Sequence, residues 1–150
     1  MEGIASFLGG THTMTIDDKG RLTVPSSFRK ALGEEIVLRK NTSDRCVEIL
    51  SPGTWNLFLQ QLASLPAMDV KANRLRAVAA ANAVYTTIDK QGRVLIPSEM
   101  KDFAGISGAQ AVVTGAINHV RVWDPGTWAA VQAEWEKEDL FEYVNEKYKI

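Results

Sequence analysis

Apolar and polar positions in the first half of the chain alternate in short blocks that predict strands, followed by longer blocks that predict helices. Residues 11–16 alternate weakly and are rich in residues that favour strands. The apolar runs 36–38 and 46–50 flank a polar turn and predict a β-hairpin. Within residues 51–66 apolar side chains recur every three or four positions, which is the helical period, and a second helix is predicted over residues 69–83.

A twelve-residue segment occurs twice, which shows that this pattern is itself repeated. Residues 15–26 read T-I-D-D-K-G-R-L-T-V-P-S and residues 87–98 read T-I-D-K-Q-G-R-V-L-I-P-S, with seven identical positions. We call these segments the first and the second box. Residues 47–55 and 120–128 both end in Pro-Gly-Thr-Trp after a strand-like run. Internal repeats are the signature of duplicated structural units, so the chain is predicted to hold two copies of one module.

Each box is predicted to fold as a β-hairpin made of its own two strands. In the first box, residues 17–20 form the turn, with Gly20 available for a positive φ angle, and residues 21–24 form the returning strand. A proline ends that strand, and Ser26 or Ser27 is predicted to cap the short helix that follows.

One module of this size has few strands and little helix to cover them, so its apolar face cannot be buried alone. Two copies packed about a pseudo-twofold axis would bury that face. We therefore predict an α+β fold, a pseudo-twofold tandem of two small β modules with linking and C-terminal helices. The predicted divisions are a first module over 7–55, a helical linker over 56–83, a second module over 84–128, and a C-terminal helix with an acidic tail over 129–150.

The distribution of charge is more informative than the net charge of −1. Residues 1–123 carry 14 Lys and Arg against 11 Asp and Glu, whereas residues 124–150 carry 3 against 7. The acidic C-terminal stretch hides a mildly basic body, so the overall charge is a poor guide to partners. No stretch approaches the roughly 20 apolar residues of a membrane span, and a cytoplasmic location is predicted. The single cysteine, Cys46, lies in an apolar run and is predicted to be a buried structural thiol.

Basic residues gather in and just after each box. A two-stranded ribbon or turn fits the major groove of DNA, where arginine reads guanine edges and lysine and backbone N–H groups contact phosphate. The competing interpretation is that the Asp–Arg pairs are surface ion pairs that only fix the turns. The second copy also contains Lys101. The predicted DNA-binding residues are Lys19, Arg21, Arg29, Lys30, Lys90 and Arg93, and the residues predicted to orient the turns are Asp17, Gly20, Asp89 and Gly92.

Other candidate chemistry is weak. His12 and His119 have no neighbouring ligands at metal-site spacing, so no metal is predicted. No phosphate-binding loop, nucleophile motif or zinc-protease motif occurs, and neither a cofactor nor an enzymatic activity is predicted. Tryptophans at helical spacing are expected in the core or in a subunit interface. A basic helix face is expected either to be solvated or to supplement phosphate binding; it comprises Lys71, Arg74 and Arg76.

Two D-x-x-x-R boxes, each followed by a strand and a proline, together with W-D-P-x-x-W after the second, resemble the MraZ family. These are bacterial transcriptional regulators associated with the division and cell-wall gene cluster. The resemblance covers residues 7–137; one box alone would fit the wider class of AbrB/SpoVT-like modules. It implies two modules of the swapped-hairpin type, a ring-like homo-oligomer, association with the nucleoid, and binding to short direct repeats in promoter DNA. The family motif falls on Asp17 and Arg21, and on Asp89 and Arg93.

Two other interpretations stay open. One is an AbrB-type, antitoxin-like module whose acidic segment 134–146 binds a partner protein. Against it, that segment contains Leu140, Phe141 and Tyr143, which are expected to pack on the protein's own body, as is Trp135. The other is a structural ring protein with no role in DNA binding.

Overall fold

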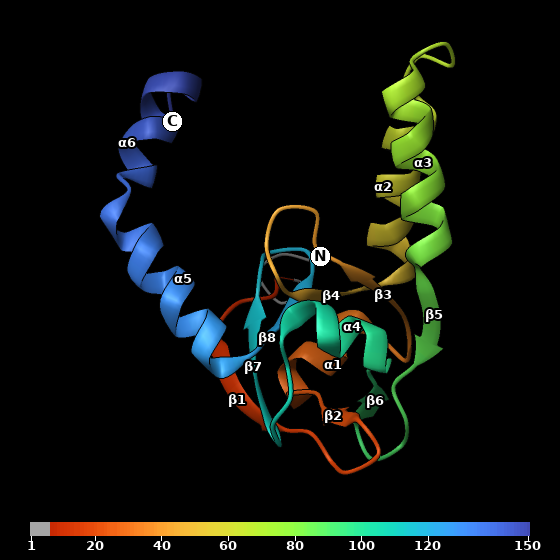
Figure 1. Cartoon of the computed structure of the whole chain (residues 1–150), viewed down its shortest axis with the longest axis vertical. Helices are drawn as coiled ribbons and strands as arrows, with labels where there is room; N and C mark the ends of the chain where they lie inside the picture. The colour runs from red at the N-terminus through yellow and green to blue at the C-terminus, as the bar shows by residue number, and fades with distance from the viewer. Residues whose placement is uncertain (1–6) are drawn as a thin grey trace.

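The computed structural model describes residues 7–150, and its elements follow the predicted order in both halves (Figure 1). The α+β tandem fold is confirmed. The strands are β1 (Thr11–Thr15), β2 (Arg21–Thr23), β3 (Glu35–Lys40), β4 (Val47–Leu50), β5 (Val84–Thr87), β6 (Arg93–Leu95), β7 (Gln110–Gly115) and β8 (Val120–Trp123). The helices are α1 (Ser26–Leu32), α2 (Pro52–Ala63), α3 (Val70–Asn82), α4 (Ser98–Ala104), α5 (Pro125–Lys137) and α6 (Leu140–Tyr148).

Strands of the two halves are interleaved in one antiparallel sheet with the order β1-β7-β8-β4-β3-β5. The strand before the first box, β1, pairs with β7 of the second half, and the strand before the second box, β5, pairs with β3 of the first half. Each half therefore supplies an outer strand to the other. The two copies therefore form one structural unit, because each needs a strand from the other to complete the sheet.

The prediction that each box folds as a hairpin of its own strands is wrong. Strand β2 pairs with β6 of the other box, with Leu22 opposite Val94, and within the first box a single bridge joins Ile16 to Leu22. The pattern of apolar residues shows that a strand exists, but two strands of nearly the same sequence are equally good partners for each other. Pairing between the boxes is favoured because it places two buried side chains, Leu22 and Val94, directly opposite one another on the inner face of the β2–β6 ribbon.

The main core lies between the six-stranded sheet and a layer made of the β2–β6 ribbon with α1 and α4. It contains Phe28 from α1, Met100 from α4 and the paired Leu22 and Val94, all at most 3 % exposed. On the other face of the sheet, α2 packs on β3 and β4 through Trp55, and α5 packs on β7 and β8 around Trp123. One side of the ribbon is thus buried against the core, and its other side faces outward.

Three of the longer helices begin where capping signals predict. Side chains of Ser51, Asp69 and Asp124 accept hydrogen bonds from the backbone N–H groups of the first turns of α2, α3 and α5. The predicted serine caps of the short helix are wrong. Pro25 occupies the position before α1, and neither Ser26 nor Ser27 makes a capping hydrogen bond, since both already lie within the helix.

Two helical arms project from opposite sides of the β body, one formed by α2 and α3 and the other by α5 and α6 (Figure 1). Trp135 of α5 packs against Trp123 and Trp128, with ring centroids 5.9 and 6.2 Å away. The expectation that the rest of the acidic segment packs on the body is wrong, because Phe141 is 80 % exposed and Leu140 and Tyr143 are also exposed. No helix within residues 7–150 is long and apolar enough to cross a membrane.

Candidate nucleic-acid interface

The first turn is held by one carboxylate that makes three hydrogen bonds. Oδ1 of Asp17 accepts from the backbone N–H groups of Lys19 and Arg21 at 3.0 and 2.9 Å, and Oδ2 accepts from Nε of Arg21 at 2.6 Å. Gly20 adopts φ +83°, a conformation that side chains disfavour, and its N–H donates to the carbonyl of Asp17. The aspartate therefore fixes both the turn and the arginine side chain that leaves it.

The second turn repeats this geometry with a looser ion pair. Oδ1 of Asp89 accepts from the backbone N–H groups of Gln91 and Arg93, both at 2.9 Å, and Gly92 adopts φ +79°. Nε of Arg93 lies 3.4 Å from Oδ2 of Asp89, and its guanidinium also donates to the side chain of Gln91. In both turns, then, the aspartate accepts from backbone N–H groups and the glycine adopts a positive φ angle.

Cross-pairing of β2 with β6 brings the two arginines to one surface. Alternate residues of a strand face opposite sides, so with Leu22 buried, Arg21 lies on the outward face of the ribbon. By the same argument, Val94 is buried and Arg93 lies outward on the neighbouring strand. Nη1 of Arg93 approaches Oδ2 of Asp17 to 3.5 Å, so the two turns share an ion pair.

The electrostatics keep these aspartates ionised at neutral pH. Hydrogen bonds from the backbone N–H groups, chiefly that of Arg21, lower the pKa of Asp17, and the corresponding bond from Arg93 lowers the pKa of Asp89. Both carboxylates remain accessible to solvent. Their value is in orienting the guanidinium groups, since exposed ion pairs contribute little to stability.

Each turn is also contacted by a cation from the short helix of the opposite half. A Cβ added at Gly92 would overlap the guanidinium of Arg29 from α1, and one added at Gly20 would lie 3.6 Å from Nζ of Lys101 from α4. Arg29 and Lys101 occupy equivalent positions of the repeat. Lys101 therefore lies beside the first turn as Arg29 lies beside the second, although the predicted set omits Lys101. Its equivalent position in the repeat is the signal that could have identified it.

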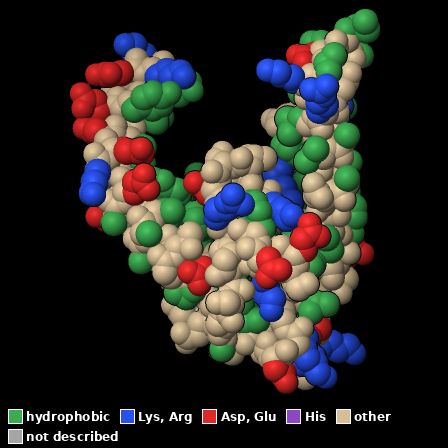
Figure 2. All heavy atoms as spheres, in the orientation of Figure 1, with side chains coloured by type: hydrophobic (Ala, Val, Ile, Leu, Met, Phe, Trp, Pro, Cys, Tyr) green, Lys and Arg blue, Asp and Glu red, His purple; other side chains and the backbone are tan. Residues whose placement is uncertain are grey.

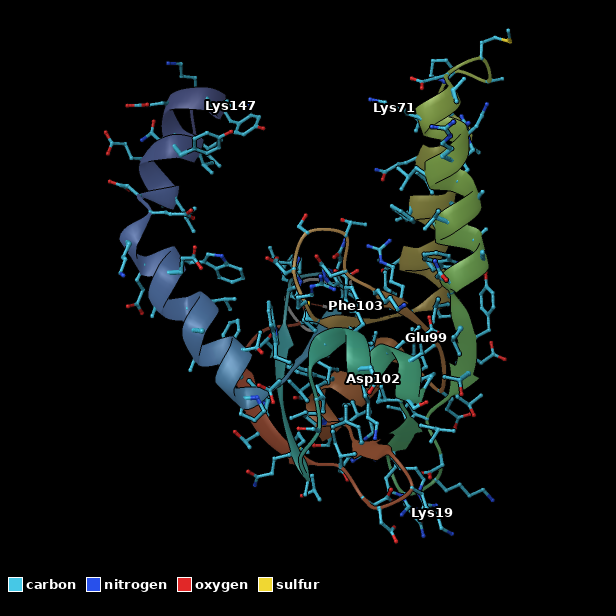
Figure 3. All side chains as sticks on the ribbon, in the orientation of Figure 1. Lys19, Lys71, Glu99, Asp102, Phe103 and Lys147 are labelled. Carbon is cyan, nitrogen blue, oxygen red and sulfur yellow. The ribbon has the colours of Figure 1, made fainter. Side chains whose placement is uncertain are left out.

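The remaining predicted cations are exposed. Lys19 lies at the end of the molecule opposite the tips of the two arms (Figure 3). Lys90 is exposed in the second turn, and Lys30 is exposed on α1 next to Arg29. Basic and acidic side chains gather at this end (Figure 2). The structure brings Arg21, Arg93 and Arg29 together with the turns, whereas no described contact joins Lys30 to them.

The basic face of α3 belongs to one of the arms instead. Lys71 lies near the tip of that arm, far from Lys19 (Figure 3). Arg76 donates from Nε to the carbonyl of Leu62 at 2.8 Å and so ties α3 to α2. This face cannot extend a phosphate-binding surface that is centred on the turns of the same chain.

A second polar cluster, which sequence reasoning missed, lies on the face of the sheet between the two arms. Glu48, only 2 % exposed, faces Arg39 and Arg121 on the neighbouring strands. Its carboxylate accepts from Nε of Arg39 at 2.5 Å and from Asn41 at 2.6 Å, and lies 3.0 Å from Nε2 of His119. Burial alone would raise the pKa of Glu48, but the hydrogen bonds from His119 and Arg39 outweigh it and lower that pKa to about 2.

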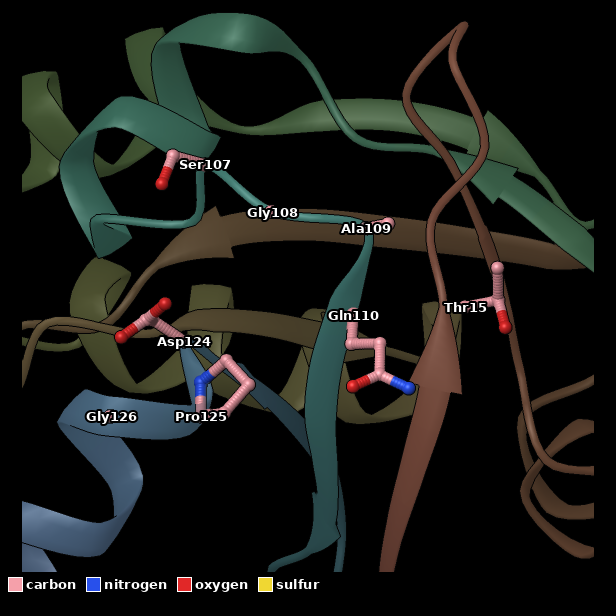
Figure 4. Close-up of a pocket in the computed structure, with 8 residues that line it drawn as sticks. All are labelled: Thr15, Ser107, Gly108, Ala109, Gln110, Asp124, Pro125 and Gly126. Atoms are coloured by element: carbon pink, nitrogen blue, oxygen red, sulfur yellow. The ribbon is translucent and has the colours of Figure 1, made fainter.

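An open pocket of about 600 Å³ lies beside the end of β1 and the start of α5 (Figure 4). The carboxylate of Asp124 caps this helix by accepting from the N–H and the hydroxyl of Thr127 at 3.0 and 3.2 Å. The helix N-terminus is therefore already satisfied by an anionic side chain. Elsewhere, His12 packs edge-on against Phe28, and residues 7–150 hold no group of three potential metal ligands.

The exchanged strands and the paired turns define a tandem β-module protein in which both boxes contribute to one composite surface. Two consecutive segments, residues 7–78 and 79–149, match the family described as "MraZ protein, putative antitoxin-like". The chain belongs to the MraZ family.

Several relatives bear the name transcriptional regulator MraZ. The relative from Roseiflexus castenholzii is 38% identical, over 81% of this chain and 84% of its own length. The one from Thermomicrobium roseum is also 38% identical, over 83% and 86%. The one from Bifidobacterium longum is 34% identical, over 91% and 90%.

Proposed function

We propose that this protein is a transcriptional regulator that binds promoter DNA through the two turns of the β2–β6 ribbon. The observation that carries the proposal is the position of Arg21 and Arg93 on one outward face, each held by the aspartate of its own turn. Two oriented guanidinium groups on a two-stranded ribbon suit the major groove, where arginine forms paired hydrogen bonds with guanine. Lys19, Lys90, Arg29, Lys30 and Lys101 supply phosphate contacts around them.

The target we propose is the promoter of a bacterial division and cell-wall gene cluster, read as short direct repeats, with the protein acting in the cytoplasm on the nucleoid. The relatives named as transcriptional regulators support regulation of transcription in general. The finer assignment extends the family resemblance of the two boxes. No catalytic step is involved.

Regulation would be carried out by a homo-oligomer of ring type. One chain presents two small turns, and repeating them around an assembly lets each chain engage a successive DNA repeat at high effective concentration. Exposed apolar side chains on both arms support association between copies. They include Met68, at 92 % exposure, and Val78 on one arm, and Phe141 on the other.

A salt titration tests the proposal. Purified protein is titrated against a duplex from the promoter of its own operon and against a scrambled duplex of equal length. Selective binding that weakens steeply with salt supports the proposal. Arg21→Ala and Arg93→Ala are expected to reduce the preference for the promoter duplex, whereas Lys71→Ala, on the remote arm, serves as the matched loss of one positive charge. Equal binding to both duplexes by the wild-type protein would contradict the proposal.

A second candidate is a partner-binding, antitoxin-like role for the acidic C-terminal segment. The observation that favours it is that α6 leaves its apolar side chains Leu140 and Phe141 uncovered instead of packing them on the body. A Phe141→Asp variant separates the two candidates. If the segment only joins copies, sedimentation will show a smaller assembly with the DNA selectivity of each chain retained; if it holds a different protein, that partner will be lost and the assembly unchanged.

A further inference from the structure

The two turns are similar in backbone but differ in charge. Asp18 of the first turn stands at the repeat position that Lys90 holds in the second, and Lys19 stands where the second turn has Gln91. Asp18, Lys19 and Lys90 are all exposed at the tips of the turns. The two residues at the first tip are therefore one acid and one base, whereas those at the second tip are a lysine and a neutral glutamine.

The helices that contact the turns enlarge this difference. Because the helices cross over, α1 of the first half contacts the second turn through Arg29, and α4 of the second half contacts the first turn through Lys101. The next residue is Lys30 in α1 but Asp102 in α4, and both are exposed. The surface formed by the second turn and α1 is therefore more basic than the surface formed by the first turn and α4.

The ion pairs across the ribbon point the same way. Oδ2 of Asp17 lies 2.6 Å from Nε of Arg21 and 3.5 Å from Nη1 of Arg93. The carboxylate that forms ion pairs with both arginines therefore belongs to the first turn. Asp89 is more exposed, and its pair with Arg93 is longer, at 3.4 Å. Nε of Arg29 is buried and has no hydrogen-bond acceptor among residues 7–150. Negative charge is thus concentrated at the first turn. The second turn instead lies beside Nε of Arg29, a hydrogen-bond donor without an acceptor among the described residues.

We infer that the two half-sites are unequal: the second turn with α1 is the principal phosphate-binding half, and the first turn with α4 binds phosphate weakly. This inference rests on the proposed function and adds the direction in which each chain binds its DNA element. A surface with equal halves would bind a site equally well in both directions. With one strongly basic half, each chain binds its DNA element in a single direction, which suits repeats that all point the same way.

Matched double variants measure the two halves separately. Lys30→Ala with Lys90→Ala removes two cations from the second half, and Lys19→Ala with Lys101→Ala removes two from the first. Each lost phosphate contact lowers the slope of log affinity against log salt by about 0.9 per chain. The second-half variant is therefore expected to lose about 1.8 from the slope, and on the order of 10- to 30-fold in promoter affinity at 0.15 M salt. The first-half variant is expected to lose less than half as much.

A charge swap separates position from total charge. Asp18→Lys combined with Lys90→Asp keeps the net charge of the chain but exchanges the tips of the two turns. We expect it to lower promoter affinity at least 10-fold and to make the first-half cations the more important pair. Equal effects of the two double variants, or unchanged binding by the swap, would overturn the inference while leaving DNA binding intact. Wild-type binding without promoter selectivity or salt dependence would instead overturn the proposed function, and this inference with it.

Discussion

Nη1 of Arg93 in the second turn lies 3.5 Å from Oδ2 of Asp17 in the first turn, while the same oxygen accepts from Nε of Arg21 at 2.6 Å. One carboxylate therefore holds the arginines of both boxes. Asp89 contacts only the arginine of its own turn among the described ion pairs. The two repeats share the Asp-x-x-x-Arg motif but not the contacts that it makes.

Asp17→Asn is therefore expected to disturb DNA recognition more than Asp89→Asn. Both variants remove one negative charge from the proposed DNA-binding surface, which alone strengthens binding to any duplex. Only loss of the orienting carboxylate lowers selectivity, and Asp17 orients two arginines where Asp89 orients one. The measurement is the ratio of affinities for promoter and scrambled duplexes. Asp17→Asn is expected to lower this ratio about tenfold more than Asp89→Asn does. Similar ratios for the two variants would show that the shared ion pair has no role in recognition.

Gly92→Ala tests the contact between the second turn and α1. Gly92 adopts φ +79°, so alanine introduces backbone strain of roughly 1 kcal/mol, and its Cβ also displaces the guanidinium of Arg29. Gly105→Ala is the matched control, because Gly105 adopts the left-handed conformation, with φ +70° and ψ +23°, and has open space around its Cβ position. We expect both variants to lose similar stability in urea unfolding, whereas only Gly92→Ala loses promoter affinity. A similar loss of DNA affinity in both would mean that strain alone, and not Arg29, is responsible.

Sequence alone predicts the elements of this fold well because their signals are local. The capping residues Ser51 and Asp124, the helical spacing around Trp55 and the glycine turns all act over a few positions. The repeat further predicts that two copies pack together. Strand partners are a different matter, since β2 and β6 carry the same apolar pattern and either partner satisfies it.

The site shows the same division between local and distant information. The Asp17–Arg21 and Asp89–Arg93 pairs are four residues apart and could be predicted from the turn. The contacts of Arg29 with Gly92 and of Glu48 with His119 join residues that are distant in the chain. They depend on which strand and which helix cross over, and no short-range pattern encodes that choice.

The exchanged pairing can be tested by a double-mutant cycle on Leu22 and Val94. Leu22 is fully buried, and Leu22→Ala is expected to cost about 2 to 5 kcal/mol in the free energy of unfolding. Because Leu22 lies opposite Val94, the two alanine variants are expected to show a coupling energy of about 0.5 kcal/mol or more. Leu57→Ala, at a 63 % exposed position, is the control and should change stability little. Strict additivity of the two core variants would argue against direct pairing of the two boxes.

The thiol of Cys46 is expected to be inert in the folded protein. Burial is the main cause that raises the pKa of this group to about 12, so the reactive thiolate is scarce at pH 8, and the surrounding core excludes reagents. Reaction with a disulfide reagent is therefore expected only through unfolding, with a rate that rises across the urea transition. Rapid reaction in native buffer, at the rate seen in denaturant, would show that this strand opens easily.

Glu48 is expected to make stability depend on pH in the acid range. Its pKa is about 2 in the folded protein against 4.5 for the ordinary side chain, a difference that corresponds to about 3 kcal/mol. Because the folded pKa is the lower one, this stabilisation is present in full above about pH 5. It is lost as the pH falls toward 2, where the carboxyl group takes up a proton in the folded state as well.

The comparison with Glu48→Gln isolates this contribution from those of other carboxylates. The variant cannot ionise at this position and leaves Arg39 without its charged partner, so it should be less stable than the wild type by about 3 kcal/mol at pH 7. Urea unfolding of both proteins between pH 7 and pH 2 should show that difference shrinking steadily below pH 5. A difference in stability that stays constant over this range would mean that Glu48 acts through packing and hydrogen bonding alone, and that its charge does not stabilise the folded protein.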